Sequence, residues 1–90
     1  MFSIKIKRRA LRRLTKLDGK RKRKIKEIVL ILKADPVPLR KADVCKLKGY
    51  DNVYRIRIGN LRMVYEVSWM ERTIIIHYIG PREKAYGRRA

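Results

Sequence analysis

The residues of this chain that could do chemistry are a set of basic side chains and one late tyrosine. Guanidinium groups held close together repel one another, so a cluster of arginines requires an anion as its counterpart. Lysines ahead of the cluster and a basic segment after it add to the same charge. The set comprises Arg55, Arg57, Arg62, Arg82, Lys84 and Tyr86, with Lys46 and Lys48 preceding it.

One reaction that suits this set is cleavage of RNA by its own 2′-hydroxyl group, because the substrate then supplies the nucleophile. The protein must align the 2′-oxygen with the phosphorus and neutralise the transition state, which arginines do through bidentate hydrogen bonds. Tyr86 or a lysine could accept the proton if nearby guanidiniums stabilise its deprotonated form. Arg82 could assist the leaving 5′-oxygen. The same residues also fit a protein that only binds RNA phosphates, so both readings stay open.

Several other catalytic arrangements are missing from the sequence. Cys45 is the single cysteine and His77 the single histidine, which excludes an internal disulfide and a cluster of cysteines or histidines around a metal. We can assign no paired carboxylates, no Ser-His-Asp set and no glycine loop that cradles phosphate. We therefore expect no metal and no cofactor, and we expect Cys45 and His77 to be structural.

The charge of the chain points to a polyanionic partner. Its 90 residues contain 26 Lys and Arg against 8 Asp and Glu, a formal net charge of +18. Such a field attracts nucleic acid first, an acidic protein second and an anionic membrane surface third. The N-terminal stretch has no apolar signal region, and no run approaches the ~18–20 apolar residues of a membrane span. We expect a soluble cytoplasmic protein made of one domain, residues 1–90.

The arginine cluster is predicted to lie on a β-hairpin from Val53 to Tyr65. Apolar and polar residues alternate on both sides of Gly59-Asn60, which is the pattern of strands with one buried face. Gly59 and Asn60 both tolerate positive φ, so they predict a two-residue turn. The hairpin therefore holds its arginines together on a rigid scaffold.

The first half of the chain predicts a strand followed by two helices. Residues 2–6 alternate as a strand that must pair with a later segment. Helical spacing then runs from Ala10 to Leu17, Asp18-Gly19 breaks it, and a second helix spans Lys20 to Lys33. The short connection predicts an antiparallel helical hairpin. The basic run at residues 20–26 is either a solvated helix face or a direct RNA contact.

The rest of the chain completes an α+β fold. Prolines at 36 and 38 end the second helix, and residues 45–49 predict a short strand. A turn at Trp69–Arg72 leads to the strand Thr73–Ile79, whose apolar run indicates burial on both faces. We expect an N-terminal strand, the helical hairpin and a twisted, mainly antiparallel sheet of three or four further strands. The arginines should lie on the sheet face away from the helices.

Ordered motifs in the second half resemble the RelE toxins of the RelE/ParE superfamily. They are KLKG, YRIR and GNLRMVY within Lys46 to Val67, and GPREKAYG at the end of Tyr78 to Gly87. The strand, helix, helix, sheet order of the whole chain is similar as well. The resemblance implies a toxin of a toxin–antitoxin pair that enters the ribosomal A site and cuts mRNA without a metal.

The resemblance also implies roles for individual residues. Arg62 and Arg82 would stabilise the transition state, and Tyr86 would stack on a base or act as general base. Arg55 and Arg57 stand where bacterial members commonly have lysines. Because arginine is a poor proton acceptor, the role of general base would fall to Tyr86 or Lys84. Lys46, Lys48 and Lys84 would bind phosphates.

The implied partners are mRNA, the ribosome and an acidic RelB-like antitoxin that forms a hetero-oligomer with the toxin. Such an antitoxin would fold on the basic surface as a helix or an added strand. The superfamily also contains ParE proteins, which have the same fold and inhibit gyrase. A ParE-like inhibitor or a non-catalytic RNA-binding domain is therefore the alternative reading.

Overall fold

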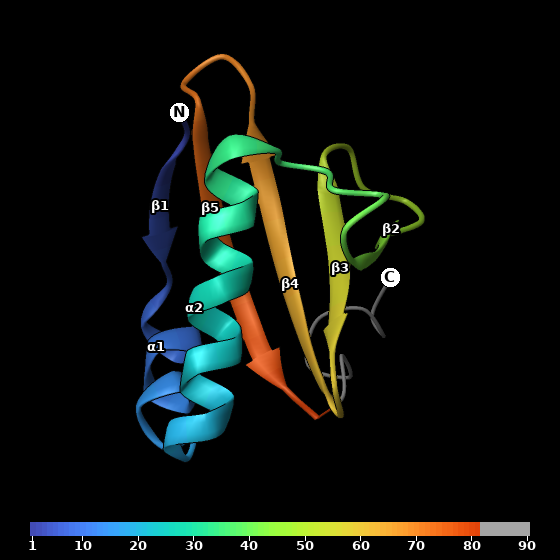
Figure 1. Cartoon of the computed structure of the whole chain (residues 1–90). Coiled ribbons are helices and arrows are strands. Elements are labelled where there is room, and N and C mark those ends of the chain that lie inside the picture. Colours follow the sequence, from blue (N-terminus) through green and yellow to red (C-terminus); the bar gives the residue numbers. More distant parts are fainter. Residues whose placement is uncertain (82–90) are drawn as a thin grey trace.

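A computed structural model describes residues 1–81 of the chain, and Figure 1 shows their arrangement. The predicted order of one strand, two helices and a run of strands is confirmed, and so is the α+β class. The elements are β1 (Ser3–Ile6), α1 (Arg8–Thr15), α2 (Gly19–Ala34), β2 (Asp43–Lys46), β3 (Val53–Ile58), β4 (Leu61–Ser68) and β5 (Thr73–Gly80).

The five strands form one sheet in the order β1-β5-β4-β3-β2. Strand β1 runs parallel to β5, with Ser3 opposite Thr73 and Ile6 opposite Ile76. The other three pairings are antiparallel, so the predicted mainly antiparallel sheet is confirmed. The first strand was expected to pair with a later segment of the chain, and that segment is β5, the last strand of the described residues.

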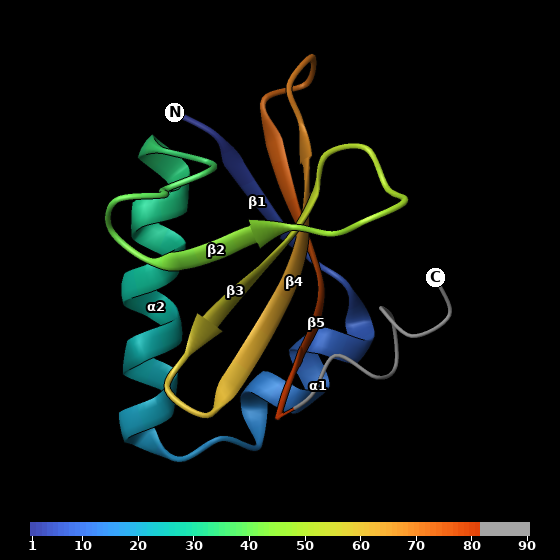
Figure 2. The same ribbon diagram turned by 90° about the vertical axis from the view of Figure 1, so that its right-hand side faces the viewer.

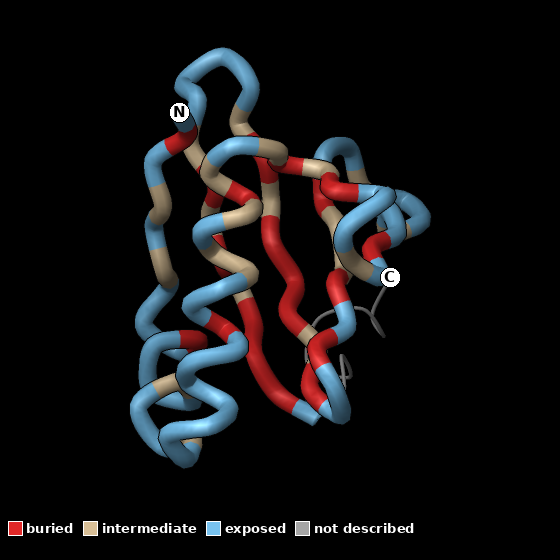
Figure 3. Tube along the Cα trace, in the orientation of Figure 1, coloured by how far each residue is buried: buried red, intermediate tan, exposed pale blue. Residues whose placement is uncertain are grey.

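Helix α2 lies across one face of the sheet (Figure 2). It buries Ile25 and Leu32 against the strands, and Tyr65 and Ile76 lie fully buried beneath it. Helix α1 packs beside β5, where the Lys7 N–H donates to the Ile76 carbonyl at 2.9 Å. The outer surfaces of both helices are exposed (Figure 3). One sheet face is thus the core, and we call the other the open face.

The turn of the central hairpin requires positive φ at one residue, whereas the sequence indicated two residues that tolerate it. Residues 59 and 60 connect β3 to β4, as predicted. Gly59 has φ +64°, whereas Asn60 is not among the residues with positive φ. Positive φ at the first central position alone is the pattern of a type II′ turn, which favours glycine there. The hairpin therefore depends on Gly59 more than on Asn60.

Several boundaries and one burial pattern differ from expectation. Strand β2 spans Asp43–Lys46 rather than 45–49, because Asp43 and Val44 pair with β3. Helix α2 begins at Gly19, since the Asp18 carboxylate caps it by accepting the Arg21 N–H at 2.9 Å. In β5, burial on both faces holds only for its last residues, and Ile75 is half-buried on the open face. Among residues 1–81, no helix covers that face over the first half of β5.

Candidate functional site

The hairpin arginines share the open face of the sheet. In the register of β3 and β4, Arg57 lies directly opposite Arg62, and Arg55 lies opposite Val64. Their chain neighbours Ile56 and Ile58 point into the core beneath α2, and adjacent residues of a strand point to opposite faces. The expectation that the arginines lie on the face away from α2 is therefore confirmed.

Arg57 and Arg62 are register partners across the two strands, and the Asp43 carboxylate approaches Arg57. The Asp43 carboxylate on β2 lies 3.9 Å from the Arg57 guanidinium, with side chains 62% and 47% exposed. An ion pair this long and this exposed contributes little. Arg57 can therefore exchange Asp43 for a stronger anion, and two guanidiniums on facing strands can grip one phosphate from two sides.

A small apolar cluster that was not predicted from the sequence lies beside the arginines. Val53, Val64 and Tyr78 are buried on the open face, and Leu47 and Tyr50 from the β2–β3 loop pack against them. The signal was present, since Val53 and Val64 alternate in phase with the arginines. The cluster places a packed apolar surface, largely shielded from water, beside the arginine side chains.

The end of β5 lies next to Arg62. Gly80 is the register partner of Arg62, and a Cβ on Gly80 would lie 2.7 Å from the Tyr78 ring carbon that carries its hydroxyl. A contact that close forces a shift, so only glycine leaves room for the Tyr78 ring here. The chain thus leaves the sheet directly beside Arg62, two residues before Arg82.

The remaining predicted site residues divide into two groups. Arg82, Lys84 and Tyr86 lie outside the described residues. Lys46 ends β2 opposite Tyr54, and the alternation of the strand puts it on the core side of the sheet edge, away from the arginines. Lys48 follows in the exposed β2–β3 loop, where both lysines line a shallow hollow of about 550 Å³. The described structure therefore brings Arg55, Arg57 and Arg62 together and leaves the two lysines apart.

The open face also carries a carboxylate that sequence reasoning did not assign. The Glu66 Oε1 lies 2.9 Å from His77 Nε2, and both side chains are partly buried. His77 is the extra residue of a bulge, since Val64 pairs with Tyr78 and Tyr65 pairs with Ile76. This pairing gives His77 a defined partner and agrees with the structural role expected of it.

Tyr65 is the tyrosine whose titration the fold changes most clearly. Its hydroxyl donates to the Pro36 carbonyl at 2.7 Å. Burial raises the pKa of Tyr65 well above its ordinary value, and the neighbouring Tyr54 and Asp35 raise it further. Because it stays protonated, Tyr65 is a structural residue and cannot serve as a base.

The described part of the chain has neither a metal-binding cluster nor a membrane-spanning helix. Residues 1–81 contain no group of three His, Cys, Asp or Glu side chains placed to hold a metal ion. No helix among them is long and apolar enough to span a membrane.

The fold itself defines a class, that of the small RelE-like toxins. The archaeal RelE–RelB complex from Pyrococcus horikoshii OT3 contains a chain that superposes with TM-score 0.82 at 35% identity, covering 90% of this chain and 94% of that one. The RelB–RelE complex from Methanococcus jannaschii matches with TM-score 0.75 at 29% identity, covering 96% and 99%. The intact Escherichia coli RelBE complex, at 21% identity and TM-score 0.79, shares the fold.

The sequence comparisons then fix the family. The family model described as the ParE toxin of the type II toxin–antitoxin system parDE matches residues 4–86. RelE1 of Methanocaldococcus jannaschii is 45% identical over 85 residues, which cover 94% of both chains. This chain belongs to the RelE/ParE family of type II toxins, and the resemblance drawn from its motifs is confirmed.

Proposed function

We propose that this toxin is an endoribonuclease of the RelE kind, which cuts mRNA on the ribosome without a metal. The observation that carries the proposal is the pairing of Arg57 with Arg62 across the hairpin, with Gly80 beside Arg62. This geometry gathers positive charge at the end of β5, two residues before Arg82 in the sequence. The likeness to RelE1 supports the RelE branch of the family.

The proposed reaction uses the 2′-hydroxyl of the mRNA as nucleophile. The 2′-oxygen attacks the adjacent phosphorus while its proton passes to Tyr86 or Lys84. The bond from phosphorus to the 5′-oxygen breaks, and the leaving oxygen takes a proton from Arg82 or from a water molecule. A 2′,3′-cyclic phosphate and a 5′-hydroxyl remain. Arg62 and Arg82 neutralise the negative charge that develops on the phosphoryl oxygens, and a donor aimed at such charge is worth roughly 10²–10³-fold in rate.

The other basic residues hold the strand in place. Arg55 and Arg57 bind the phosphates next to the scissile one, and alignment of the 2′-oxygen with the phosphorus follows from that grip. Lys46 and Lys48, which lie at the sheet edge and in the exposed loop, contact RNA farther along. The proposed target requires that the toxin act in the cytoplasm, where ribosomes translate.

We also propose that the partner of this toxin is an acidic RelB-like antitoxin. The Pyrococcus and Methanococcus structures are complexes of RelE with RelB. A net charge of +18 favours an acidic chain, and an antitoxin that covers the open face would block the arginines from RNA.

The proposal is tested by single-turnover cleavage of ribosome-bound mRNA. Arg62→Ala and Arg82→Ala should each slow cleavage by roughly 10²-fold or more, the scale of one lost transition-state donor. Arg12→Ala is the matched control, because it removes the same charge from the exposed surface of α1 and should cleave at the wild-type rate. Circular dichroism must show that all three variants are folded.

The outcome also separates the two branches of the family. Wild-type cleavage rates in both arginine variants would overturn the assigned site. The family model carries the name of ParE, so gyrase is the second target to assay. Intact mRNA together with inhibited DNA supercoiling would replace the ribonuclease by a gyrase inhibitor.

A further inference from the structure

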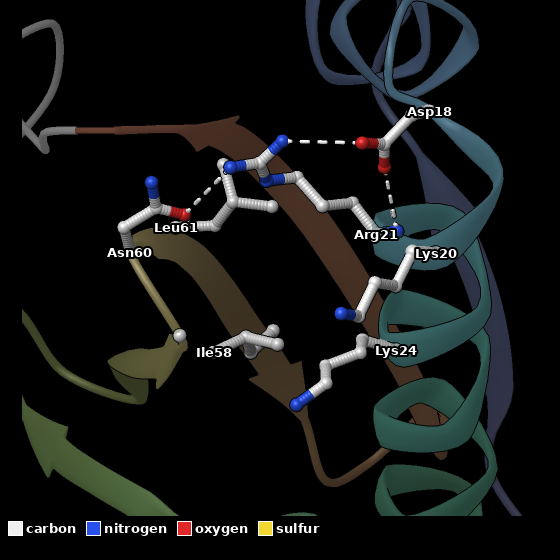
Figure 4. Close-up of a pocket in the computed structure, with 8 residues that line it drawn as sticks. Asp18, Lys20, Arg21, Lys24, Ile58, Asn60 and Leu61 are labelled. Atoms are coloured by element: carbon white, nitrogen blue, oxygen red, sulfur yellow. Dashed lines mark hydrogen bonds and ion pairs between the residues drawn. The ribbon is translucent and has the colours of Figure 1, made fainter.

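A basic pocket lies on the core side of the sheet, between the start of α2 and the tip of the β3–β4 hairpin. It has a volume of about 350 Å³, and Figure 4 shows side chains of α2 and of the hairpin facing each other across it. This is within the range of sites that hold a small ligand. The lining residues are Asp18, Lys20, Arg21, Lys24, Ile58, Gly59, Asn60 and Leu61.

Positive charge dominates the rim of this hairpin-tip pocket. Lys20 and Lys24 stand one helical turn apart on α2, and Figure 4 shows both pointing toward the hairpin. Like charges at this spacing repel each other. The single carboxylate of the rim, Asp18, already lies 3.4 Å from the Arg21 guanidinium. The two ammonium groups therefore face the pocket without a carboxylate of the pocket rim to balance them.

Arg21 holds the two walls of the pocket together. Its guanidinium donates to Asp18 Oδ2 and to Asn60 Oδ1, each at 3.4 Å (Figure 4). Asp18 belongs to the start of α2, whereas Asn60 belongs to the hairpin turn, so Arg21 bridges segments far apart in the sequence. Arg21 thus spans the pocket from one wall to the other.

The floor of the pocket is apolar and its outer edge is open. Ile58 and Leu61 are 7% and 6% exposed. A Cβ built on Gly59 would meet no atom within 4 Å, so the turn is open at this position. An apolar floor under a cationic rim suits a nucleotide, whose ribose and base have apolar faces and whose phosphate carries the charge.

The pocket and the arginine pair are the two sides of one hairpin tip. Ile58 follows Arg57 and Leu61 precedes Arg62, and neighbouring strand residues point to opposite faces. An RNA strand that passes around Gly59 therefore meets the arginines on the open face and the lysines on the core side. Because RNA carries a phosphate at every nucleotide, one continuous strand can supply an anion both to the arginines and to the lysines. The separate carboxylates of a folded protein do not follow such a continuous path.

We propose that the hairpin-tip pocket binds a phosphate of single-stranded RNA, on the strand that the arginine pair also holds. The inference rests on the proposed function, since it takes RNA as the ligand of the open face. It extends the RNA path around the hairpin to Lys20 and Lys24. It also gives the basic run of α2, which the sequence left between a solvated face and an RNA contact, a defined role for two of its residues.

The test is RNA binding as a function of salt, with matched variants. The double variant Lys20→Gln/Lys24→Gln removes two charges from the pocket. Lys22→Gln/Lys26→Gln removes two charges from the same helix at the same spacing, but on the side that lines the apolar groove toward α1. The probe is a fluorescent single strand of about eight nucleotides, within the usual site size, with 2′-O-methyl groups that prevent cleavage.

The expected result is a change of salt dependence in one variant only. The slope of log affinity against log salt is about −0.7 per phosphate for single strands, so the pocket variant should lose roughly one such unit. The control variant should keep the wild-type slope, although both variants have the same net charge.

Three results would overturn the proposal. Equal slopes in both variants would mean that only the overall field acts, and no measurable binding of the probe would remove RNA as the ligand. A pocket variant that binds RNA normally but binds the antitoxin weakly would assign the pocket to the protein partner. Because the probe cannot be cut, each result is independent of whether the toxin cleaves mRNA.

Discussion

At the scale of single residues, burial removes Tyr65 from the candidates for the general base. Tyr65 lies fully buried with its hydroxyl bonded to the Pro36 carbonyl, and desolvation favours the neutral phenol. The proposed general base is accordingly sought after β5, at Lys84 or Tyr86, which follow the sheet in the sequence.

Tyr65 gives a stability prediction with a defined dependence on pH. Its pKa is raised in the folded protein, so its contribution is complete below the unfolded value of about 10. Above that pH the unfolded chain loses the proton first, and the contribution falls as pH rises toward the folded value. Tyr65→Phe should lower the free energy of unfolding by about 0.5–1.5 kcal/mol at neutral pH, the net value of one hydrogen bond.

The measurement is urea unfolding of the wild type and of Tyr65→Phe at several pH values. The difference between the two should be constant from neutral pH to about pH 10 and should shrink above it. Lysines titrate in the same range, but they are common to both proteins and cancel in the difference. A gap that widened above pH 10 would contradict the raised pKa of Tyr65.

At the scale of elements, the start of α2 depends on a single carboxylate. Asp18 caps the helix, and the first turn contains no acidic residue, while the residues after Gly19 are basic. Cations at a helix N-terminus oppose its macrodipole. Asp18→Ala should therefore destabilise the protein by about 0.5–2 kcal/mol, the usual value of a lost cap.

The variant Asp18→Asn keeps a side chain that can cap the helix but removes the negative charge, so it separates these two contributions to stability. Asparagine can still accept the Arg21 N–H, so thermal unfolding should place this variant between the wild type and Asp18→Ala. Both substitutions remove the one carboxylate of the hairpin-tip pocket and should strengthen RNA binding. Equal stability of the two variants would show that the charge of Asp18, and not its cap, holds the helix.

The elements that the sequence predicted well are those with local signals. Alternation around Gly59 fixed the hairpin, and the apolar stripe containing Ile25 and Leu32 fixed α2. Strand β2 was placed two residues late, because Lys46, Leu47 and Lys48 continue an alternating pattern while pairing with β3 selects Asp43 and Val44. Tertiary pairing decided that boundary, and no local signal encodes it.

The candidate site was predictable in part for the same reason. Arg57 and Arg62 share a hairpin, so their proximity follows from the turn between them. The hairpin-tip pocket joins Arg21 to Asn60, which lie 39 residues apart. No sequence pattern in either segment indicates that it packs near the other. The apolar cluster of Val53, Val64 and Tyr78 likewise requires the register of three strands.

At the scale of the whole molecule, the net charge of +18 acts in opposite directions on folding and on binding. Binding to RNA releases counterions from its phosphates. Salt weakens this binding because the release of counterions into a more concentrated salt solution gains less entropy. The same salt screens the repulsion among the basic side chains and stabilises the folded state. The described residues measure 33 × 31 × 26 Å, and a Debye length of about 30 Å at 0.01 M salt therefore reaches across the molecule.

Stability should therefore rise with salt over the range in which RNA affinity falls. At 1 M salt the Debye length is about 3 Å, and only touching charges still interact. The helices contain four like-charged pairs at i, i+4: Arg8 with Arg12, Arg9 with Arg13, Lys20 with Lys24 and Lys22 with Lys26. Each costs about 0.2–0.5 kcal/mol, so screening these pairs alone should raise the free energy of unfolding by about 1–2 kcal/mol.

Urea is the denaturant for this measurement, because guanidinium is itself a salt. Lys20→Gln/Lys24→Gln and Lys22→Gln/Lys26→Gln each remove one of the four pairs, so both should show a smaller rise with salt than the wild type. The two variants should thus behave alike in stability while they differ in the salt dependence of RNA binding. A wild type that lost stability between 0.01 M and 1 M salt would show that its ion pairs outweigh its self-repulsion.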